Sequence, residues 1–213
     1  MIRDYALLVI ASYLIGAIPW GFIVGKVQGI DVRKHGSGKT GATNTLRTLG
    51  TRSSALVFLC DMAKGVVVVL LARHFLQSPT AEVIAALAAV VGHNWSVYIR
   101  FFGGRGVSIS LGSCFAMYPP VAILGVVAFA SVIILTKYVS LASILGIACT
   151  VFALISLYWF GLDLRWFGAV PVEYVIYSLV AGPLVVFAHW DNIVRLRSGR
   201  ERRLGEQLEA EGN

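Results

Sequence analysis

Charge is what this sequence has least of. Asp, Glu, Lys and Arg together make up only 14% of its 213 residues, whereas hydrophobic residues make up 57%. A soluble domain carries about 25% charged residues, so the composition argues against a water-soluble protein and favours a surface that faces lipid. The six prolines are scattered, and no charged or Ser-rich stretch forms a linker. We therefore expect one integral-membrane domain over residues 1–213.

Cysteine and other metal-binding or nucleophilic patterns are equally sparse. The three cysteines, Cys60, Cys114 and Cys149, lie inside apolar runs and show no CxxC spacing. Neither a disulfide framework nor a metal site is therefore predicted. The sequence also contains no GxSxG nucleophile elbow. We expect a protein without a metal or another cofactor.

Long apolar runs are what the sequence does contain. A helix that crosses a bilayer needs about 20 mostly apolar residues, which predicts an all-α, polytopic bundle of transmembrane helices. The third and fourth runs are short, and hydropathy alone leaves open that they join or re-enter the membrane. The seven runs are Tyr5–Val27, Ser54–Phe75, Ala81–Gly92, Val107–Tyr118, Val121–Thr136, Leu141–Phe160 and Val172–Ala188.

Lys and Arg are unevenly divided between the two ends of such a bundle. With seven crossings, only Arg3, Arg73 and Arg165 fall on one side, and nearly all of the other cations fall on the opposite side. Because cytoplasmic loops carry an excess of Lys and Arg, we expect the N-terminus outside and the C-terminus in the cytoplasm. The position of these cations at the ends of apolar runs indicates anionic lipid or an anionic substrate, and no nucleic acid.

One cation lies inside an apolar run. Lys64 follows Asp61 by three residues, so the two side chains share one face of a helix and can pair. A buried ion pair in a membrane is costly and often functional. The sequence leaves open whether this pair is structural or functional.

Three polar, glycine-rich segments border the apolar runs on the cation-rich side. The first is Gly36–Asn44, where glycines permit positive φ angles and expose successive N–H groups to an anion. A flexible loop explains the glycines but not the density of hydroxyl and amide donors. The letters GSGKT suggest a nucleotide-binding P-loop, but Arg33 stands where that motif requires glycine five residues before Gly38. We therefore do not expect ATP or GTP to bind.

The second and third segments add cationic and imidazole groups. Arg105 lies among glycines in Gly92–Gly106, which suits bidentate contact with phosphate, while His93 there is either a ligand or a helix-end histidine. In the third segment, His189–Glu201, His189 and Asn192 lie three residues apart on one helical face. For the tail arginines, the interpretation is contact with lipid headgroups; they are Arg200, Arg202 and Arg203.

Together the three segments resemble the PlsY family, bacterial integral-membrane glycerol-3-phosphate acyltransferases that use acyl phosphate as the donor. The family motifs GSGNxGATN, GHxxPxFxxFxGGKG and HxxNIxRLxxGxE match in order, and the similarity covers almost the whole chain. It implies seven transmembrane helices in the bacterial cell membrane, with the active site facing the cytoplasm. The chain departs from the family pattern at Lys39, Ser96, Arg105 and Ala188.

The resemblance implies transfer of a fatty acyl group from acyl phosphate to the sn-1 hydroxyl of glycerol 3-phosphate, which forms lysophosphatidic acid. The His-x4-Asp pair of another glycerolipid acyltransferase class is absent. The base is either His189 or a substrate phosphate oxygen. The implied catalytic residues are His189, Asn192 and Ser37. The implied substrate-binding residues are Gly36, Gly38, Gly41, Thr43, Asn44, Arg47, His93, Gly104, Arg105 and Ser143.

Two other functions remain open on the sequence. A membrane anion transporter or binding protein would share the basic loops, although no inverted repeat of two halves is found. A weakened acyltransferase paralogue that acts as a lipid-binding scaffold is favoured only by the four departures. The expected partners are the two small-molecule substrates and membrane lipid, with no obligate protein partner.

Overall fold

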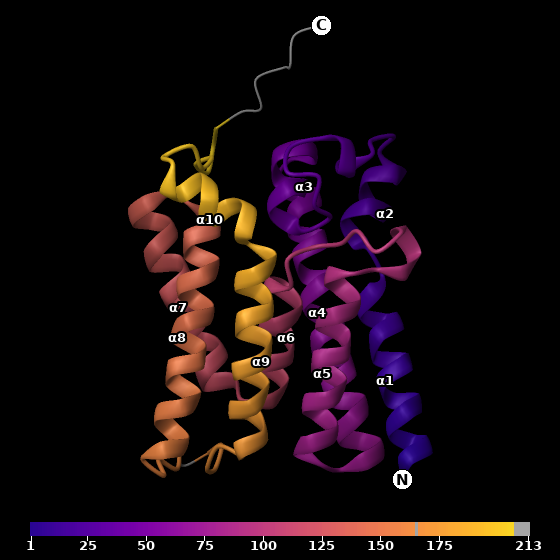
Figure 1. Ribbon diagram of the computed structural model, residues 1–213, viewed down its shortest axis with the longest axis vertical. Helices are drawn as coiled ribbons and strands as arrows, with labels where there is room; N and C mark the ends of the chain where they lie inside the picture. Colours follow the sequence, from indigo (N-terminus) through magenta and orange to yellow (C-terminus); the bar gives the residue numbers. More distant parts are fainter. Residues whose placement is uncertain (165, 207–213) are drawn as a thin grey trace, which may run out of the picture.

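The computed structural model describes residues 1–164 and 166–206, which form an elongated bundle of helices (Figure 1). This confirms the predicted all-α class. Two short 3-10 turns, Val32–Lys34 and Val97–Ile99, interrupt the loops. The α-helices are α1 (Ile2–Ala17), α2 (Trp20–Val27), α3 (Ala42–Leu49), α4 (Thr51–Leu76), α5 (Pro79–Asn94), α6 (Val107–Met117), α7 (Pro119–Thr136), α8 (Val139–Trp159), α9 (Val172–Ala188) and α10 (Trp190–Arg197).

Six of the seven apolar runs each coincide with one helix and the first coincides with two, but the helices differ in their ability to cross a membrane. Within the described residues, five segments are long and apolar enough to cross a membrane, or six if α9 and α10, which are bent by 59° relative to each other, form one span. The fourth run is the short helix α6, which has 11 residues. Figure 1 shows that the chain after α5 turns back across the bundle before α6 begins. The protein is therefore a multi-pass membrane protein.

The first run is broken at Pro19 into α1 and α2. The break frees backbone carbonyls inside the bundle, and Lys64 donates hydrogen bonds from Nζ to the carbonyl oxygens of Gly16 and Ile18, both at 2.8 Å. The same Nζ lies 2.8 Å from Asp61 Oδ1. In lipid, an unsatisfied carbonyl costs several kcal/mol. The intramembrane cation therefore stabilises a helix break, which gives the Asp61–Lys64 pair a structural role.

The helices pack as two groups. In one group α1 packs along α5, and α4 packs along both α5 and α6; in the other α7 packs along α8, and α8 along α9. The contact between α4 and α6 needs glycine on both sides. A Cβ at Gly65 would collide with the carbonyl of Ile109, and one at Gly112 would collide with the carbonyl of Met62. Small residues let membrane helices approach closely in this way.

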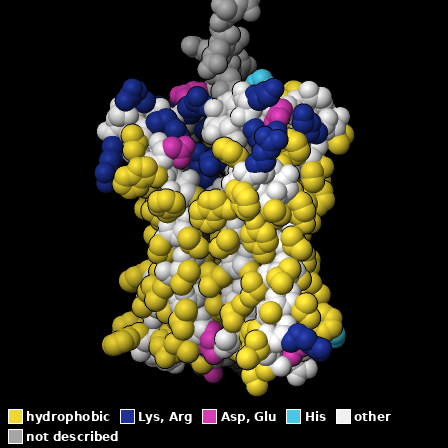
Figure 2. Space-filling view, turned by 45° about the vertical axis from the view of Figure 1, so that its right-hand side comes forward, with side chains coloured by type: hydrophobic (Ala, Val, Ile, Leu, Met, Phe, Trp, Pro, Cys, Tyr) yellow, Lys and Arg dark blue, Asp and Glu magenta, His cyan; other side chains and the backbone are white. Residues whose placement is uncertain are grey.

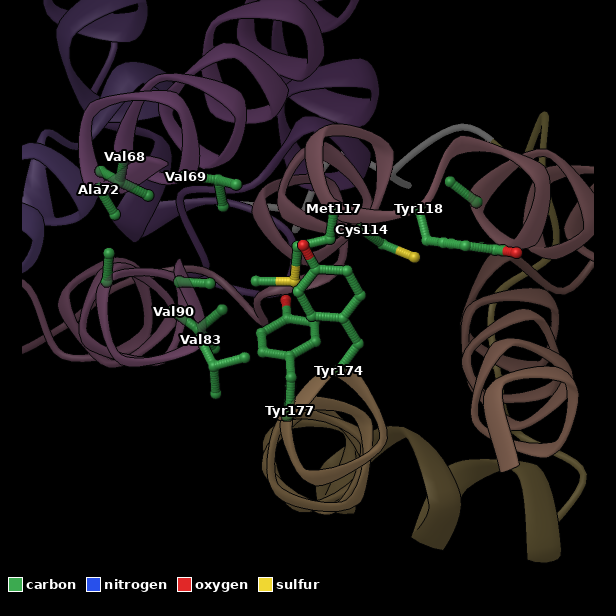
Figure 3. Close-up of a cluster of buried hydrophobic side chains, with 14 of the residues drawn as sticks. Val68, Val69, Ala72, Val83, Val90, Cys114, Met117, Tyr118, Tyr174 and Tyr177 are labelled. Carbon is green, nitrogen blue, oxygen red and sulfur yellow. The ribbon is translucent and has the colours of Figure 1, made fainter. Parts of the chain in front are cut away.

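The apolar core lies where α4, α5, α6 and α9 meet (Figure 3). Small side chains of α4 and α5 face one another, and the rings of Tyr174 and Tyr177 reach from α9 towards Met117 and Cys114 on α6. This packing ties α9 to the first group of helices. It closes the bundle at one end and leaves the other end to polar residues.

The surface is divided in the same way. Figure 2 shows an apolar waist, with Lys and Arg side chains gathered at the upper end of the molecule. The loops around α3 and α10 lie at that end, and the N-terminus lies at the opposite end (Figure 1). At the N-terminal end Arg73 pairs with the buried carboxylate of Glu82 at 2.8 Å. Arg165, which the sequence places on the cation-poor side, lies outside the described residues.

Candidate functional site

A cavity of about 330 Å³ opens beneath the cation-rich end, between the two groups of helices. Its wall takes in residues of α3 to α10 and of the loop before α6. Four predicted site residues, Gly36, Ser37, Gly38 and Gly104, do not line it. The predicted residues that do line it are Gly41, Thr43, Asn44, Arg47, His93, Arg105, Ser143, His189 and Asn192.

Asn44 organises the first glycine-rich loop. Its buried amide nitrogen donates to the carbonyl oxygens of Val32 and Lys39, both at 2.9 Å, and of His35 at 3.1 Å. Its Oδ1 accepts the backbone N–H of Ser37 at 2.9 Å. The sequence predicts Asn44 as a hydrogen-bond donor to substrate, but its amide nitrogen and its amide oxygen both bond to the loop itself. Asn44 sets the shape of the loop.

The glycines of this loop are needed for its backbone. Gly36 and Gly38 have φ angles of 61° and 69°, a region that side chains other than glycine rarely occupy. The turn buries the hydroxyl of Ser37, and that hydroxyl has no hydrogen-bond partner among the described residues. Gly41 then caps α3, whose first-turn N–H groups have no acceptor within the helix. The loop thus presents donors beside the cavity.

The second segment packs against the first. The N–H of Thr40 points to the carbonyl of Gly103 at 3.5 Å, and the N–H of Gly104 donates to the carbonyl of His93 at 3.0 Å. A Cβ at Gly104 would collide with the ring of His93, so this glycine allows the loop to lie against the imidazole. His93 Nδ1 in turn lies 3.3 Å from Lys64 Nζ. This contact links the cavity wall to Lys64, which donates hydrogen bonds to the carbonyl groups at the helix break.

Arg105 connects the second segment to the third. Its Nε donates to the carbonyl of Ala188 at 3.1 Å, and its Nη2 contacts Asp191 Oδ2 at 2.7 Å. Burial lowers the pKa of Arg105, and Asp191 opposes that shift. A guanidinium keeps its proton at any physiological pH. The group therefore remains a cation at the cavity, held in place by one carbonyl and one carboxylate.

His189 lies at the bend between α9 and α10 and is 4% exposed. Its Nδ1 lies 2.8 Å from the carbonyl oxygen of Val185. Because a carbonyl oxygen only accepts hydrogen bonds, Nδ1 carries the hydrogen, and Nε2 of the neutral ring is left as an acceptor. A ring held in this tautomer is able to take a proton from a hydroxyl group.

Glu201 is the site residue that sequence reasoning missed. This buried carboxylate accepts hydrogen bonds from Ser140 Oγ at 2.9 Å and Asn192 Nδ2 at 2.7 Å, and it pairs with Arg195 Nε at 2.8 Å. Asn192 is thereby fixed, and its Oδ1 is buried without a hydrogen-bond partner among the described residues. The available signal was the position of Glu201 at the end of the third motif. Without that motif, a carboxylate in a segment rich in arginine is expected to be exposed to solvent.

Two further cations reach the cavity wall without a carboxylate of their own. Arg47 on α3 makes no side-chain hydrogen bond or ion pair among residues 1–164 and 166–206. Its pKa is lowered by burial and by the charges of Arg202, Arg105 and Arg195. Burial and Arg105 likewise lower the pKa of Lys39. The polar end of the cavity therefore has an excess of positive charge.

The other end of the cavity is apolar. It extends between α6, α7, α8 and α9, where small residues leave space between the helices. Ser143 lies near the boundary and donates its hydroxyl hydrogen to the carbonyl of Val139 at 2.9 Å, which leaves its oxygen free to accept. The apolar wall includes Leu111, Cys114, Ala122, Gly125, Phe129, Ile147, Val151, Ala181 and Gly182.

The fold and the cavity define a class: a multi-pass helical membrane protein whose cation-lined pocket continues into an apolar groove. The sequence matches the family model described as glycerol-3-phosphate acyltransferase over residues 6–199. This match covers most of the chain. The chain belongs to the glycerol-3-phosphate acyltransferase family.

Full-length relatives and solved structures agree with this assignment. The glycerol-3-phosphate acyltransferase of Crocosphaera subtropica is 39% identical, over 98% of this chain and 97% of the relative. That of Halalkalibacterium halodurans is 40% identical, over 95% and 97%. The crystal structure of PlsY (YgiH), an integral membrane glycerol 3-phosphate acyltransferase in its glycerol 3-phosphate form, superposes with a TM-score of 0.86. It has 35% sequence identity and covers 95% of this chain and 96% of that one.

Proposed function

We propose that this membrane acyltransferase moves a fatty acyl group from acyl phosphate to the sn-1 hydroxyl of glycerol 3-phosphate. The products are lysophosphatidic acid and inorganic phosphate. The observation that carries the proposal is the cavity itself, because one end holds cations and hydrogen-bond donors and the other end is apolar. An acyl phosphate needs both environments at once. Glycerol 3-phosphate needs only the polar one.

The polar end divides into two sets of residues. Arg47, Arg105 and Ser143 bind glycerol 3-phosphate, together with the third-segment residues Asn192 and His189. The backbone of the first loop and Thr43 hold the acyl phosphate. The loop owes its shape to Gly36, Gly38 and Asn44, and Gly41 is the N-cap of α3. Gly104 and His93 support the wall between the two sets.

The reaction requires little covalent chemistry from the protein. The sn-1 hydroxyl oxygen attacks the carbonyl carbon of the mixed anhydride, a carbon–oxygen ester bond forms, and the bond to the phosphate oxygen breaks. The hydroxyl proton passes either to Nε2 of His189 or to an oxygen of the departing phosphate. The donor is already activated, so catalysis consists of positioning and charge neutralisation. Arg105 and the first loop supply the positive charge.

The acyl chain lies in the apolar groove between α6, α7, α8 and α9, with its carbonyl carbon at the polar end. The active site faces the cytoplasm of a bacterial cell membrane. The chain crosses the membrane seven times, and α6 supplies one crossing together with the loop before it. The concentration of cations around α3 and α10 supports this orientation (Figure 2).

A phosphate-release assay on purified protein tests the proposal. With acyl phosphate as donor, we expect phosphate release to depend on added glycerol 3-phosphate and to match the amount of lysophosphatidic acid formed. A transporter or a lipid-binding scaffold would release no phosphate beyond the rate of spontaneous hydrolysis. That result would overturn the proposed function.

A further inference from the structure

The segment that follows α10 borders the cavity, which Glu201 lines. Glu201 is buried among Ser140, Asn192 and Arg195, as described above, and the N–H of Leu204 donates to the carbonyl of Lys137 at 2.7 Å. These contacts anchor residues 200–204 to the turn between α7 and α8. We call these residues the strap. The backbone of the strap is therefore fixed relative to α8 and α10.

The strap separates three arginines that the sequence groups together. Arg203 lies against the ring of Tyr138, with its guanidinium carbon 5.5 Å from the ring centre. Arg200 turns back to Ser198 Oγ at 3.2 Å. Arg202 instead reaches towards the first glycine-rich loop, where its Nη1 comes within 4.0 Å of the position that a Cβ at Gly36 would occupy. Of these three arginines, Arg202 is the one whose side chain lies beside the first glycine-rich loop.

The surroundings of Arg202 hold positive charge in excess. Within the part of the chain that the structure describes, it pairs with no carboxylate. The two carboxylates nearby are already engaged, Asp191 by Arg105 and Glu201 by Arg195. Arg47 on α3 also has no carboxylate partner among the described residues; burial and the charge of Arg202 lower its pKa, and Glu201 opposes that shift. Arg47 is half-buried and Arg202 is exposed, and two like charges near each other repel.

We propose that Arg202 is a phosphate-binding residue, which together with Arg47 holds the phosphate group of a substrate between the strap and the first loop. A phosphate dianion between two guanidiniums converts their repulsion into two charge-assisted interactions. Because Gly36 has no side chain, the space between it and Arg202 is not filled by a Cβ. The identification of the phosphate as a substrate group rests on the proposed function. Both substrates carry such a group, so the test must separate them.

The experiment compares Arg202→Gln with Arg200→Gln, a matched loss of one charge two residues away on the same strap. Initial rates are measured while glycerol 3-phosphate and acyl phosphate are varied in turn. Because a charge-assisted hydrogen bond contributes about 1.5–3 kcal/mol, we expect Arg202→Gln to raise one KM about tenfold or more and Arg202→Lys to restore part of it. The substrate whose KM rises is the one that Arg202 binds. Equal KM values in Arg202→Gln and Arg200→Gln would overturn the proposal.

A binding measurement separates this proposal from the proposed function. The affinity of the wild type and of both variants for inorganic phosphate and glycerol 3-phosphate is measured by titration calorimetry, which needs no turnover. Weaker binding by Arg202→Gln alone supports the phosphate site even if the wild type shows no acyl transfer. Unchanged affinity in Arg202→Gln would reject it even if the enzyme is active.

Discussion

At the scale of single residues, one cation of the site, Arg105, is already held by the protein. Arg105 contacts both the carbonyl of Ala188 and the carboxylate of Asp191. The guanidinium is therefore oriented before a substrate arrives, which lowers the entropic cost of binding. A phosphate at this position would either bind Arg105 together with Asp191 or displace the Asp191 carboxylate from Arg105. Arg47 has no such competitor among the described residues.

Substitution of Arg105 tests this role. We expect Arg105→Ala to lower kcat/KM by about 100-fold or more, because it removes a cation at the position where negative charge develops. Arg105→Lys should retain much of the activity, since lysine is the residue usual in the family motif. The exposed Arg197 on α10 provides the control, and Arg197→Ala should behave like the wild type. A near-normal rate for Arg105→Ala in folded protein would exclude it from the site.

At the scale of helices, the groove between α7, α8 and α9 depends on small residues. Gly182 on α9 faces α8, and a Cβ added there would lie 3.0 Å from Val151 Cγ2 and 3.7 Å from Ile147 Cγ2. A larger side chain at this position must therefore either fill the groove or push α8 aside. If the groove holds the acyl chain, its width at Gly182 limits the donors that fit.

We predict that Gly182→Leu lowers activity selectively with long-chain acyl phosphates. The added side chain takes up room that the distal carbons need, and each CH2 excluded from an apolar site forfeits about 0.8 kcal/mol of binding. Rates with a short-chain donor should fall much less. Val180→Leu, on the lipid-facing side of the same helix, is the matched control. An equal loss with short and long donors would show that the substitution perturbs the fold and not the groove.

The membrane-embedded helices could be predicted from the sequence because a helix that faces lipid needs a long run of apolar side chains. All seven apolar runs therefore appear as helices in the structure. The contacts of the site join segments far apart in the sequence, and hydropathy carries no information on them. The pattern of glycines indicated an anion-binding loop, but it did not show that the Asn44 side chain makes its hydrogen bonds to the backbone of that loop. Nor did it show that Glu201 is buried.

At the scale of the whole molecule, the two ends of the bundle differ in charge. Arg and Lys gather at the end that holds α3 and α10, while the opposite end carries few cations (Figures 1 and 2). The N-terminus of α1 lies at this second end (Figure 1). Since cationic loops stay in the cytoplasm, the charge distribution and the path of the chain favour the same orientation.

Reporter fusions test the orientation. A reporter fused after Asn213 should fold in the cytoplasm, and one fused before Met1 should be exported, because seven crossings place the ends on opposite sides. A reporter inserted in the loop between α2 and α3 would independently mark the side of the first glycine-rich segment. If both termini were found on one side, α6 and its preceding loop would not make a crossing, and the seven-crossing arrangement would be wrong.

The most direct test of the account is the choice of acyl donor. The cavity offers a cation-lined end for two phosphate groups and an apolar groove for one acyl chain, and the mixed anhydride needs no further activation. Purified protein is given glycerol 3-phosphate with either acyl phosphate or acyl-CoA of the same chain length, in the presence of a chelator, and lysophosphatidic acid is measured. We predict rapid product formation from acyl phosphate and little or none from acyl-CoA. Robust turnover with acyl-CoA, or complete loss of activity in chelator, would contradict the account.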